Sequence, residues 1–503
     1  MALEDAEKTA VVRSNDGSVA SELQAVDAKA LFKERLCLKL DLHILVPMLF
    51  LNVLSLMGRT NIGAALIQEL PADLHLTAMR VFLATTMPLV MLILFEVPSN
   101  LLMKWLEAKF NLSYMRYLSL ITVCLGKKAE CDIHDPFRIT LTSLAGLVTL
   151  GQAFDKTYSA LLATRFVIGI FDAGLIPGCV FILSLYYPSI HMQWRMSMLM
   201  VANLISNIVS NILAFVIAEI RNQNGWHGWR WIFLVEGCLT MVIGLACCTS
   251  NTGRPEKANF LTQEEKDIIS LSVESRVSTI GYVAEWEVFF SNILNYVWAS
   301  LYVLTCSTTY SVALFAPSFV KVFKPHLSTP AIQGQVVPIF VVSAATCLLV
   351  AWLADRTNHR STYAIIGYIF TIIGYLILHF PRHYSSSVMM LGLYFVSIGT
   401  YSSLPMVWTL TTLNLATPLQ KAIGSGFVIG IGNAAGFVSA WIFRTSEAPY
   451  YKSGMVDGLI LTCCAAGLTA VTWVYIEWHN RKTSRTSDNI ESLSSGVVFK
   501  YRS

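Results

Sequence analysis

Charged residues are scarce in this chain of 503 residues: Asp, Glu, Lys and Arg make up 14% of it, against about 25% in soluble globular proteins. The 11 cysteines include no CxxC pair, and the ten histidines show no spacing typical of a metal site. No GxSxG, HExxH, Walker or dinucleotide-binding glycine motif is present. No basic block with interleaved aromatics is found either. The sequence therefore predicts no enzyme, no metal or cofactor site and no nucleic-acid partner.

The chain is rich in long apolar stretches, and 54% of its residues are hydrophobic. About 20 such residues span the hydrocarbon core of a bilayer as a helix. About twelve stretches qualify, at residues 41–64, 81–106, 113–126 (continuing after 139), 157–184, 197–219, 230–250, 288–318, 333–354, 361–380, 387–410, 422–443 and 455–477. We predict an all-α integral membrane protein that crosses the lipid bilayer about twelve times.

A polar stretch at about residues 251–284 divides the predicted spans into six and six. Two six-helix halves joined by a linker are typical of transporters whose substrate site lies between the halves near mid-membrane. The basic residues beside the first and last spans, Lys33, Arg35, Lys39, Arg481, Lys482 and Arg485, place both termini in the cytosol. The predicted parts are a tail (1–39), a helical bundle (40–250), a linker (251–287), a second bundle (288–478) and a tail (479–503). Within the linker, Thr262 is the expected N-cap of a short helix.

The third predicted span is interrupted by a polar stretch, Lys127 to Pro136. Without residues 126–145, its two apolar parts would join into one uninterrupted span. We therefore interpret 126–145 as a retained intron or an insertion. An enlarged external loop is the alternative, but it leaves a span that is too short.

Several motifs occur in a fixed order along the chain. They are Lys39-Leu-Asp41, Gly58-Arg-Thr-Asn-Ile-Gly63, Phe95-Glu-Val-Pro-Ser-Asn-Leu-Leu102, Arg165-Phe-Val-Ile-Gly-Ile-Phe-Asp-Ala-Gly-Leu-Ile-Pro-Gly178, Gly228-Trp-Arg-Trp-Ile-Phe-Leu-Val-Glu-Gly237, Pro255-Glu-Lys257, Ala354-Asp-Arg356, Gly430-Ile-Gly-Asn433 and Phe443-Arg-Thr-Ser-Glu-Ala-Pro-Tyr450. In this order they resemble the motifs of the fungal allantoate permease family, which belongs to the anion:cation symporters of the major facilitator superfamily. The resemblance covers about residues 36 to 480.

This resemblance implies two six-helix bundles that rock about a central cavity, and the uptake of a small organic anion, often driven by protons. Members of the family carry ureides such as allantoate, or carboxylate vitamins such as nicotinate, pantothenate and biotin. An exporter of a specialised metabolite derived from the same family is the alternative function. We expect a monomer in the plasma membrane, with the vacuolar membrane as the alternative location.

Polar residues within the spans are the candidate substrate or coupling groups, because a buried charge costs about 2.5–3.5 kcal/mol on insertion scales. Arg59, with Asn61 nearby, is the candidate for the carboxylate of the substrate; alternatively, Arg59 reaches the interface or pairs with Glu96. Glu96 is the candidate proton carrier, and Asn100, one turn on, shares its face. The alternative for Glu96 is a structural hydrogen bond between helices.

Arg165 and Asp172 share one face of the fourth span, and Gly169 between them allows a neighbouring helix to approach. The resemblance places this arginine among the proton-linked residues, and an architectural ion pair is the alternative. The chain departs from the family at Gly58, where an Asp is usual, and at Asp172, where Glu is usual. The absence of an acid at 58 is expected to leave Arg59 without a local counter-charge.

Further residues are candidates for the cavity lining and for the gate. Asn203, Asn207 and Asn211 form a stripe on the fifth span that either bonds to other helices or lines the cavity. Further cavity candidates are Asn295, Tyr310, Trp408 and Asn433, although aromatic residues on spans more often pack or anchor at an interface. Asp355 and Arg356, after the eighth span, are predicted to latch a cytosolic gate.

Overall fold

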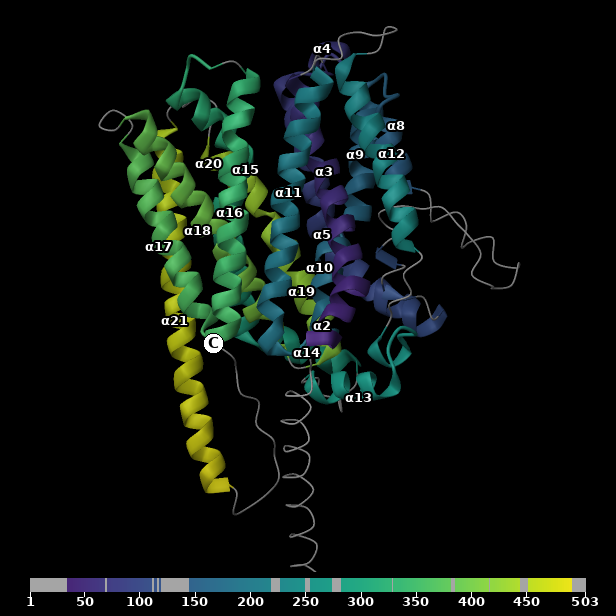
Figure 1. Ribbon diagram of the computed structural model, residues 1–503, viewed down its shortest axis with the longest axis vertical. Coiled ribbons are helices and arrows are strands. Elements are labelled where there is room, and N and C mark those ends of the chain that lie inside the picture. Colours follow the sequence, from purple (N-terminus) through teal and green to yellow (C-terminus); the bar gives the residue numbers. More distant parts are fainter. Residues whose placement is uncertain are drawn as a thin grey trace, which may run out of the picture.

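The computed structural model describes residues 34–67, 70–110, 113–114, 117–118, 144–218, 227–248, 254–273, 282–327, 329–380, 385–415, 417–443 and 451–490. All the regular elements in these ranges are helices, and the long ones stand roughly side by side in two groups (Figure 1). Helices suit the interior of a bilayer, because each one satisfies its own backbone hydrogen bonds. The predicted all-α membrane fold is confirmed.

The first group contains the helices that precede the linker. They are α2 (Glu34–Leu40), a π-helical turn (Asp41–Leu45), α3 (Val46–Ile67), α4 (Leu70–Asp73), α5 (Ala78–Phe110), α8 (Leu144–Gln152), α9 (Tyr158–Asp172), α10 (Leu175–Tyr186), a 3-10 turn (Ser189–His191), α11 (Met192–Ala218) and α12 (Gly228–Cys248). Helices α9 and α10 follow one another as a single span, Tyr158–Tyr186.

The second group follows the linker. Its helices are α15 (Ile293–Phe323), α16 (Thr329–Thr357), α17 (Arg360–His379), α18 (Ser386–Leu413), α19 (Pro418–Asn433), α20 (Ala435–Ile442) and α21 (Lys452–Ile490). Helices α19 and α20 together make one span, Pro418–Ser439. The two groups meet where α5 and α10 pack on α19, and where α11 packs on α16 and α18.

Ten helices within the described ranges are long and apolar enough to cross a membrane. They correspond to ten of the twelve predicted spans. The predicted sixth span is the 21-residue helix α12, and of the third only α8 and short pieces before it are described. The proposed insertion at 126–145 lies outside the described residues, apart from the first residues of α8.

Several predicted boundaries were wrong. The first helix begins at Glu34, within the predicted tail, and α21 continues to Ile490, beyond the predicted end at 478. The predicted seventh span, 288–318, is divided by Asn292, whose side chain caps α15 by accepting from the backbone N–H of Leu294 at 3.1 Å. Caps of this kind depend on backbone conformation, so hydropathy alone does not locate them.

The linker contacts both groups. It contains a 3-10 turn (Pro255–Lys257), α13 (Gln263–Ser272) and α14 (Tyr282–Ser291). Arg254 and Lys257 pair with Glu107 on α5, and α14 packs on α19. Thr262 caps α13 in a reciprocal capping box with Glu265, as predicted. Helices α2, α13 and α14 lie at one end of the molecule, which we call the linker end, and α4 lies at the opposite end (Figure 1).

Gly169 allows two helices of the first group to pack closely. A Cβ atom at Gly169 on α9 would lie 2.8 Å from the backbone of Pro88 on α5, which is too close for any side chain. The expected approach of a neighbouring helix at Gly169 is confirmed, and it holds α9 against the helix that carries Glu96.

Candidate transport site

Arg59 on α3 and Asp172 at the end of α9 form a buried ion pair. Nε of Arg59 donates to Oδ2 of Asp172 at 3.1 Å, and Nη2 donates to the backbone oxygen of Asp172 at 3.3 Å. Ser55, one helical turn before Arg59, donates to Oδ1 of Asp172 at 2.8 Å. The expectation that Arg59 lacks a counter-charge was wrong, because a helix distant in sequence supplies the carboxylate. The predicted alternative, a direct pair with Glu96, was also wrong.

Arg165 on α9 is connected to the carboxyl group of Glu236 through the side-chain amide of Asn61. Its guanidinium donates to the backbone oxygen of Gly58 at 3.0 Å and to Oδ1 of Asn61 at 3.1 Å. The amide of Asn61 donates in turn to Glu236 on α12. Arg165 is 1% exposed, and its guanidinium lies 5.5 Å from the ring centre of Phe233. Arg165 and Asp172 thus both face α3, as their spacing predicted.

Glu236 was not among the predicted site residues. It is buried, and its Oε1 has no hydrogen-bond partner among the described residues. The sequence alone could have identified Glu236, because it is the acid within the apolar motif Gly228 to Gly237. A charged residue in a span is by default a functional candidate.

Glu96 joins the two halves. It is 1% exposed, and its Oε1 accepts a hydrogen bond of 2.5 Å from the amide of Asn433 on α19. Tyr310 on α15 donates to the amide oxygen of Asn433 at 3.1 Å. Glu96 Oε2 has no partner among the described residues, but Glu96 and Arg59 interact electrostatically. Glu96, Tyr310 and Asn433 therefore lie together at the junction of the halves.

Asn100, one turn after Glu96, also faces α19. Its amide donates to the backbone oxygen of Ala422 and to Oγ of Ser425, each at 3.0 Å. The prediction that Asn100 shares the face of Glu96 is confirmed.

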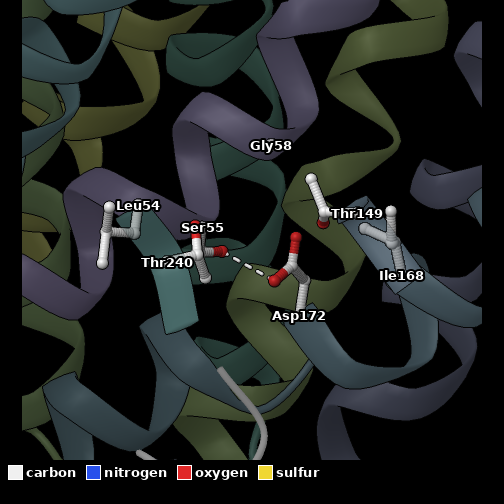
Figure 2. A pocket seen from close by; sticks show the side chains of 7 residues that line it. All are labelled: Leu54, Ser55, Gly58, Thr149, Ile168, Asp172 and Thr240. Atoms are coloured by element: carbon white, nitrogen blue, oxygen red, sulfur yellow. Dashed lines mark hydrogen bonds between the residues drawn. The ribbon is translucent and has the colours of Figure 1, made fainter. Parts of the chain in front are cut away.

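A small pocket opens beside the ion pair, between α3, α8, α9 and α12 (Figure 2). Its polar lining is Ser55, Thr149, Asp172 and Thr240, and its remaining walls are Leu54, Gly58 and Ile168. Its cavity volume is about 20 Å³, and the surrounding space is about 290 Å³ when open solvent is included. In Figure 2, one carboxylate oxygen of Asp172 meets Ser55 and the other points towards the turn of α3 that carries Gly58.

A pair of stacked aromatic rings lies in the second half. Tyr302 on α15 and Trp408 on α18 stack with ring centres 6.3 Å apart. Asn295, predicted to line the cavity, instead donates to the backbone oxygen of Phe289 at 2.7 Å and fixes the corner between α14 and α15. Its position at the first turn of α15, rather than mid-helix, explains why that prediction was wrong.

The asparagine stripe on α11 bonds along its own helix. Asn207 donates to the backbone and side-chain oxygens of Asn203 at 2.9 and 3.1 Å, and Asn211 donates to the backbone oxygen of Asn207 at 2.7 Å. The interhelical hydrogen bonds that were one explanation of the stripe are not formed by these amides in the described structure.

Asp355, at the end of α16, fastens the two halves together at the linker end. Its carboxylate accepts from the backbone N–H groups of Gln193 and Trp194, at 3.3 and 2.8 Å, at the start of α11. Arg360 supports it at 3.6 Å and donates to the backbone oxygen of Ser189 at 2.5 Å. A carboxylate at the N-terminus of a helix also gains from the helix dipole. Arg356, predicted to share this contact, instead lies over the ring of Trp352 at 4.5 Å.

Asp155 lies outside the spans, in the turn between α8 and α9. Thr164 donates to its carboxylate at 3.2 Å, and Arg230 donates to its backbone oxygen at 3.3 Å. Burial raises the pKa of Asp155 to about 6, although the hydrogen bond from Thr164 and the charges of Arg165 and Arg230 oppose the shift.

The family model of the Major Facilitator Superfamily matches residues 136–443, which is more than half of the chain. The chain belongs to the major facilitator superfamily. An uncharacterised transporter of Schizosaccharomyces pombe is 25% identical over 486 residues, which cover 96% of this chain and 91% of the relative. The major facilitator-type transporter hxnP of Emericella nidulans is 26% identical over 496 residues, covering 96% and 93%. A candidate tartrate transporter of Agrobacterium vitis is 25% identical over 456 residues, covering 89% and 91%.

Solved structures of this superfamily have the same fold. The proton:xylose symporter XylE, bound to 6-bromo-6-deoxy-D-glucose, has a TM-score of 0.66 at 14% identity and covers 86% of this chain and 95% of its own. FucP in its outward conformation has a TM-score of 0.60 at 12% identity, covering 85% and 98%. This major facilitator protein is therefore a membrane transporter and not an enzyme.

Proposed function

We propose that this protein is a proton-coupled secondary transporter of a small organic anion, and that it works by alternating access. The observation that carries the proposal is the composition of the buried charge cluster, which we define as Arg59, Glu96, Arg165, Asp172 and Glu236. Electrostatic interactions link Arg59 to Glu96 and Asp172, and Arg165 to Asp172 and Glu236. The cluster thus holds two guanidinium groups and three carboxyl groups.

The charge of this cluster favours the joint binding of a proton and an anion. Arginine stays charged in proteins, so two cations face three acids, and the cluster is neutral when one carboxyl carries a proton. A monoanion that binds to it adds one negative charge. Uptake of one further proton compensates that charge, and an uncompensated charge at mid-membrane costs several kcal/mol. This charge balance supports symport of an anion with protons.

Two carboxyls of the cluster are available for the proton. Asp172 is bonded directly to Arg59, whereas the hydrogen bonds of Glu96 and Glu236 come from the amides of Asn433 and Asn61. Glu96 and Glu236 also each have one oxygen without a partner among the described residues. Arg59 is the proposed anchor of the anion. Two of the five N–H donors of its guanidinium are used within the described structure, which leaves three.

The remaining assignments follow from this mechanism. The resemblance to the allantoate permeases and the similarity to a candidate tartrate transporter support an organic anion as the substrate. We propose that the linker end faces the cytosol, and that the Asp355 contact with α11 closes that end. Alternating access would break this contact when the site opens towards the linker end.

The test uses purified protein in liposomes, with a panel of labelled carboxylates and a neutral amide analogue of each. Inward pH gradients should drive accumulation of at least one carboxylate, a protonophore should abolish it, and the amide should not accumulate. Glu236→Gln and Glu96→Gln should each keep exchange of substrate across the membrane and reduce gradient-driven accumulation. Accumulation that ignores the pH gradient, or equal transport of amide and acid, would overturn the proposal. Extrusion from liposomes against a substrate gradient, without uptake, would favour the exporter.

A further inference from the structure

The pocket beside Asp172 has no role in the mechanism above, yet it adjoins the proposed anchor of the anion. Gly58 makes the space, because a Cβ atom built there would meet no atom of the described residues outside its own stretch of helix within 4 Å. Most other glycines that face a neighbouring helix are different: at Gly169 and Gly237, for example, a Cβ would lie within 2.8 Å of a neighbour. Gly58 therefore does not serve helix packing, and the volume next to it is left unfilled.

Four of the seven residues that line this pocket carry a hydroxyl or carboxyl oxygen, which can accept a hydrogen bond. Asp172 contributes a carboxylate, and each of its oxygens has a second lone pair beyond the bonds from Ser55 and Arg59. Thr149 on α8 and Thr240 on α12 add hydroxyl groups to this lining (Figure 2). The hydroxyl of Thr240 makes no hydrogen bond with any residue in the described part of the chain. A ligand group that donates a hydrogen bond suits the carboxylate of Asp172 and the hydroxyl of Thr240, whereas an apolar group would add no partner for either.

The size of the pocket limits that group to a few atoms. The cavity volume is about 20 Å³, and about 10–15 Å³ is needed to hold one water molecule. A single hydroxyl or N–H group therefore fits, but a ring does not.

We propose that the pocket formed at Gly58 is a specificity subsite that receives a hydrogen-bond donor carried next to the carboxylate of the substrate. This inference rests on the proposed function. The carboxylate binds the remaining N–H donors of Arg59, and a hydroxyl on the adjacent carbon enters the pocket and donates to Asp172. The preferred substrates are thus small 2-hydroxy acids and similar anions with an adjacent N–H group, in preference to the matching unsubstituted acids.

The experiment compares matched pairs of labelled acids in liposomes: malate with succinate, and lactate with propionate. The wild-type protein should favour the hydroxy acid of at least one pair by about tenfold in kcat/KM, as expected for one buried hydrogen bond of about 1.4 kcal/mol. Gly58→Val fills the pocket and should bring that ratio to within about threefold of unity, while transport of the unsubstituted acid persists. Gly58→Ala, which meets no atom, should reduce the ratio by a smaller amount.

Two controls separate pocket filling from other effects. Gly467→Val on α21 adds the same atoms at a helical glycine that also has open space around it, and should leave the ratio unchanged. Thr240→Val keeps the volume and removes a hydroxyl, and should reduce the ratio without loss of protein. An unselective wild-type protein, or a ratio that survives in both Gly58→Val and Thr240→Val, would overturn the subsite while carboxylate transport still supports the proposed function. If the wild-type protein moves no carboxylate at all, the proposed function fails and the subsite fails with it.

Discussion

Asn433 on α19 donates a hydrogen bond of 2.5 Å to Glu96 on α5, across the boundary between the two halves of the protein. The two residues are 337 positions apart. The amide of Asn433 also bonds back to Ile429 on its own helix, at 3.2 Å, so its orientation is fixed. Protonation of Glu96 would change the strength of its hydrogen bond with Asn433, which joins the two halves. The charge state of Glu96 therefore affects how the two halves are held relative to each other.

Glu96→Gln tests this connection. The glutamine keeps an oxygen that accepts from Asn433, so the halves should still assemble, but the side chain no longer exchanges a proton. We expect near-normal substrate exchange and at least a tenfold loss of accumulation driven by a pH gradient, measured with labelled substrate in liposomes. Asn100→Asp, one turn away, should not reproduce this pattern. Wild-type accumulation by the Gln variant would remove Glu96 from coupling.

Arg59→Ala should raise KM at least tenfold or abolish transport, because loss of a charged partner in a buried site costs about 2–5 kcal/mol. Arg59→Lys should rescue only partly, since the forked geometry is lost. The Ala variant also leaves Asp172 without its cation, and breaking a buried pair destabilises a protein by about 3–5 kcal/mol.

The double variant Arg59→Ala, Asp172→Asn separates these two effects. It should recover thermal stability in detergent relative to the single variant, and it should still fail to bind carboxylates. A single Ala variant that is well expressed and transports carboxylates normally would show that Arg59 is not the anion site.

Asp355→Ala should loosen the contact with α11 and favour the state open at the linker end. A cysteine introduced on the cavity-facing side of α11 should then react faster with a membrane-impermeant thiol reagent added from that end, in a background where the reactive native cysteines are replaced. Arg356→Ala is the matched control, because Arg356 lies over Trp352 and makes no hydrogen bond or ion pair with α11 in the described structure. Equal labelling rates in the two variants would rule out Asp355 as a latch.

The raised pKa of Asp155 predicts that the thermal stability of the protein depends on pH. Its pKa is raised from 3.8 to about 6 in the folded protein, so folding favours the protonated carboxyl. The stabilising contribution is present in full below about pH 3.8 and is lost as the pH rises through about 6. Asp155→Asn, which stays neutral, should therefore lose less thermal stability than the wild-type protein between pH 4.5 and 8. Melting curves in detergent measure this difference, and Asp267→Asn on the exposed face of α13 provides the comparison. An unchanged pH profile in Asp155→Asn would contradict the assignment.

Local patterns in the sequence predicted the spans, the division into two halves and the cap at Thr262, because hydropathy and capping depend on residues within one helix. The same kind of reasoning placed Glu96 and Asn100 on one face, and Arg165 and Asp172 on another. Asn295 and Arg356 were assigned wrongly, since their positions at helix ends point them away from the cavity and the latch.

The sequence by itself determined that this is a transporter-like membrane protein with charged residues inside its first half. Only the tertiary structure decided the partners of those charges: Asp172 for Arg59, Asn61 for both Arg165 and Glu236, and Asn433 for Glu96. Helical periodicity tells which residues share a face, but it does not tell which helix lies opposite. Side-chain packing across helices makes that choice, and it also leaves the space at Gly58 that no pattern along the chain reveals.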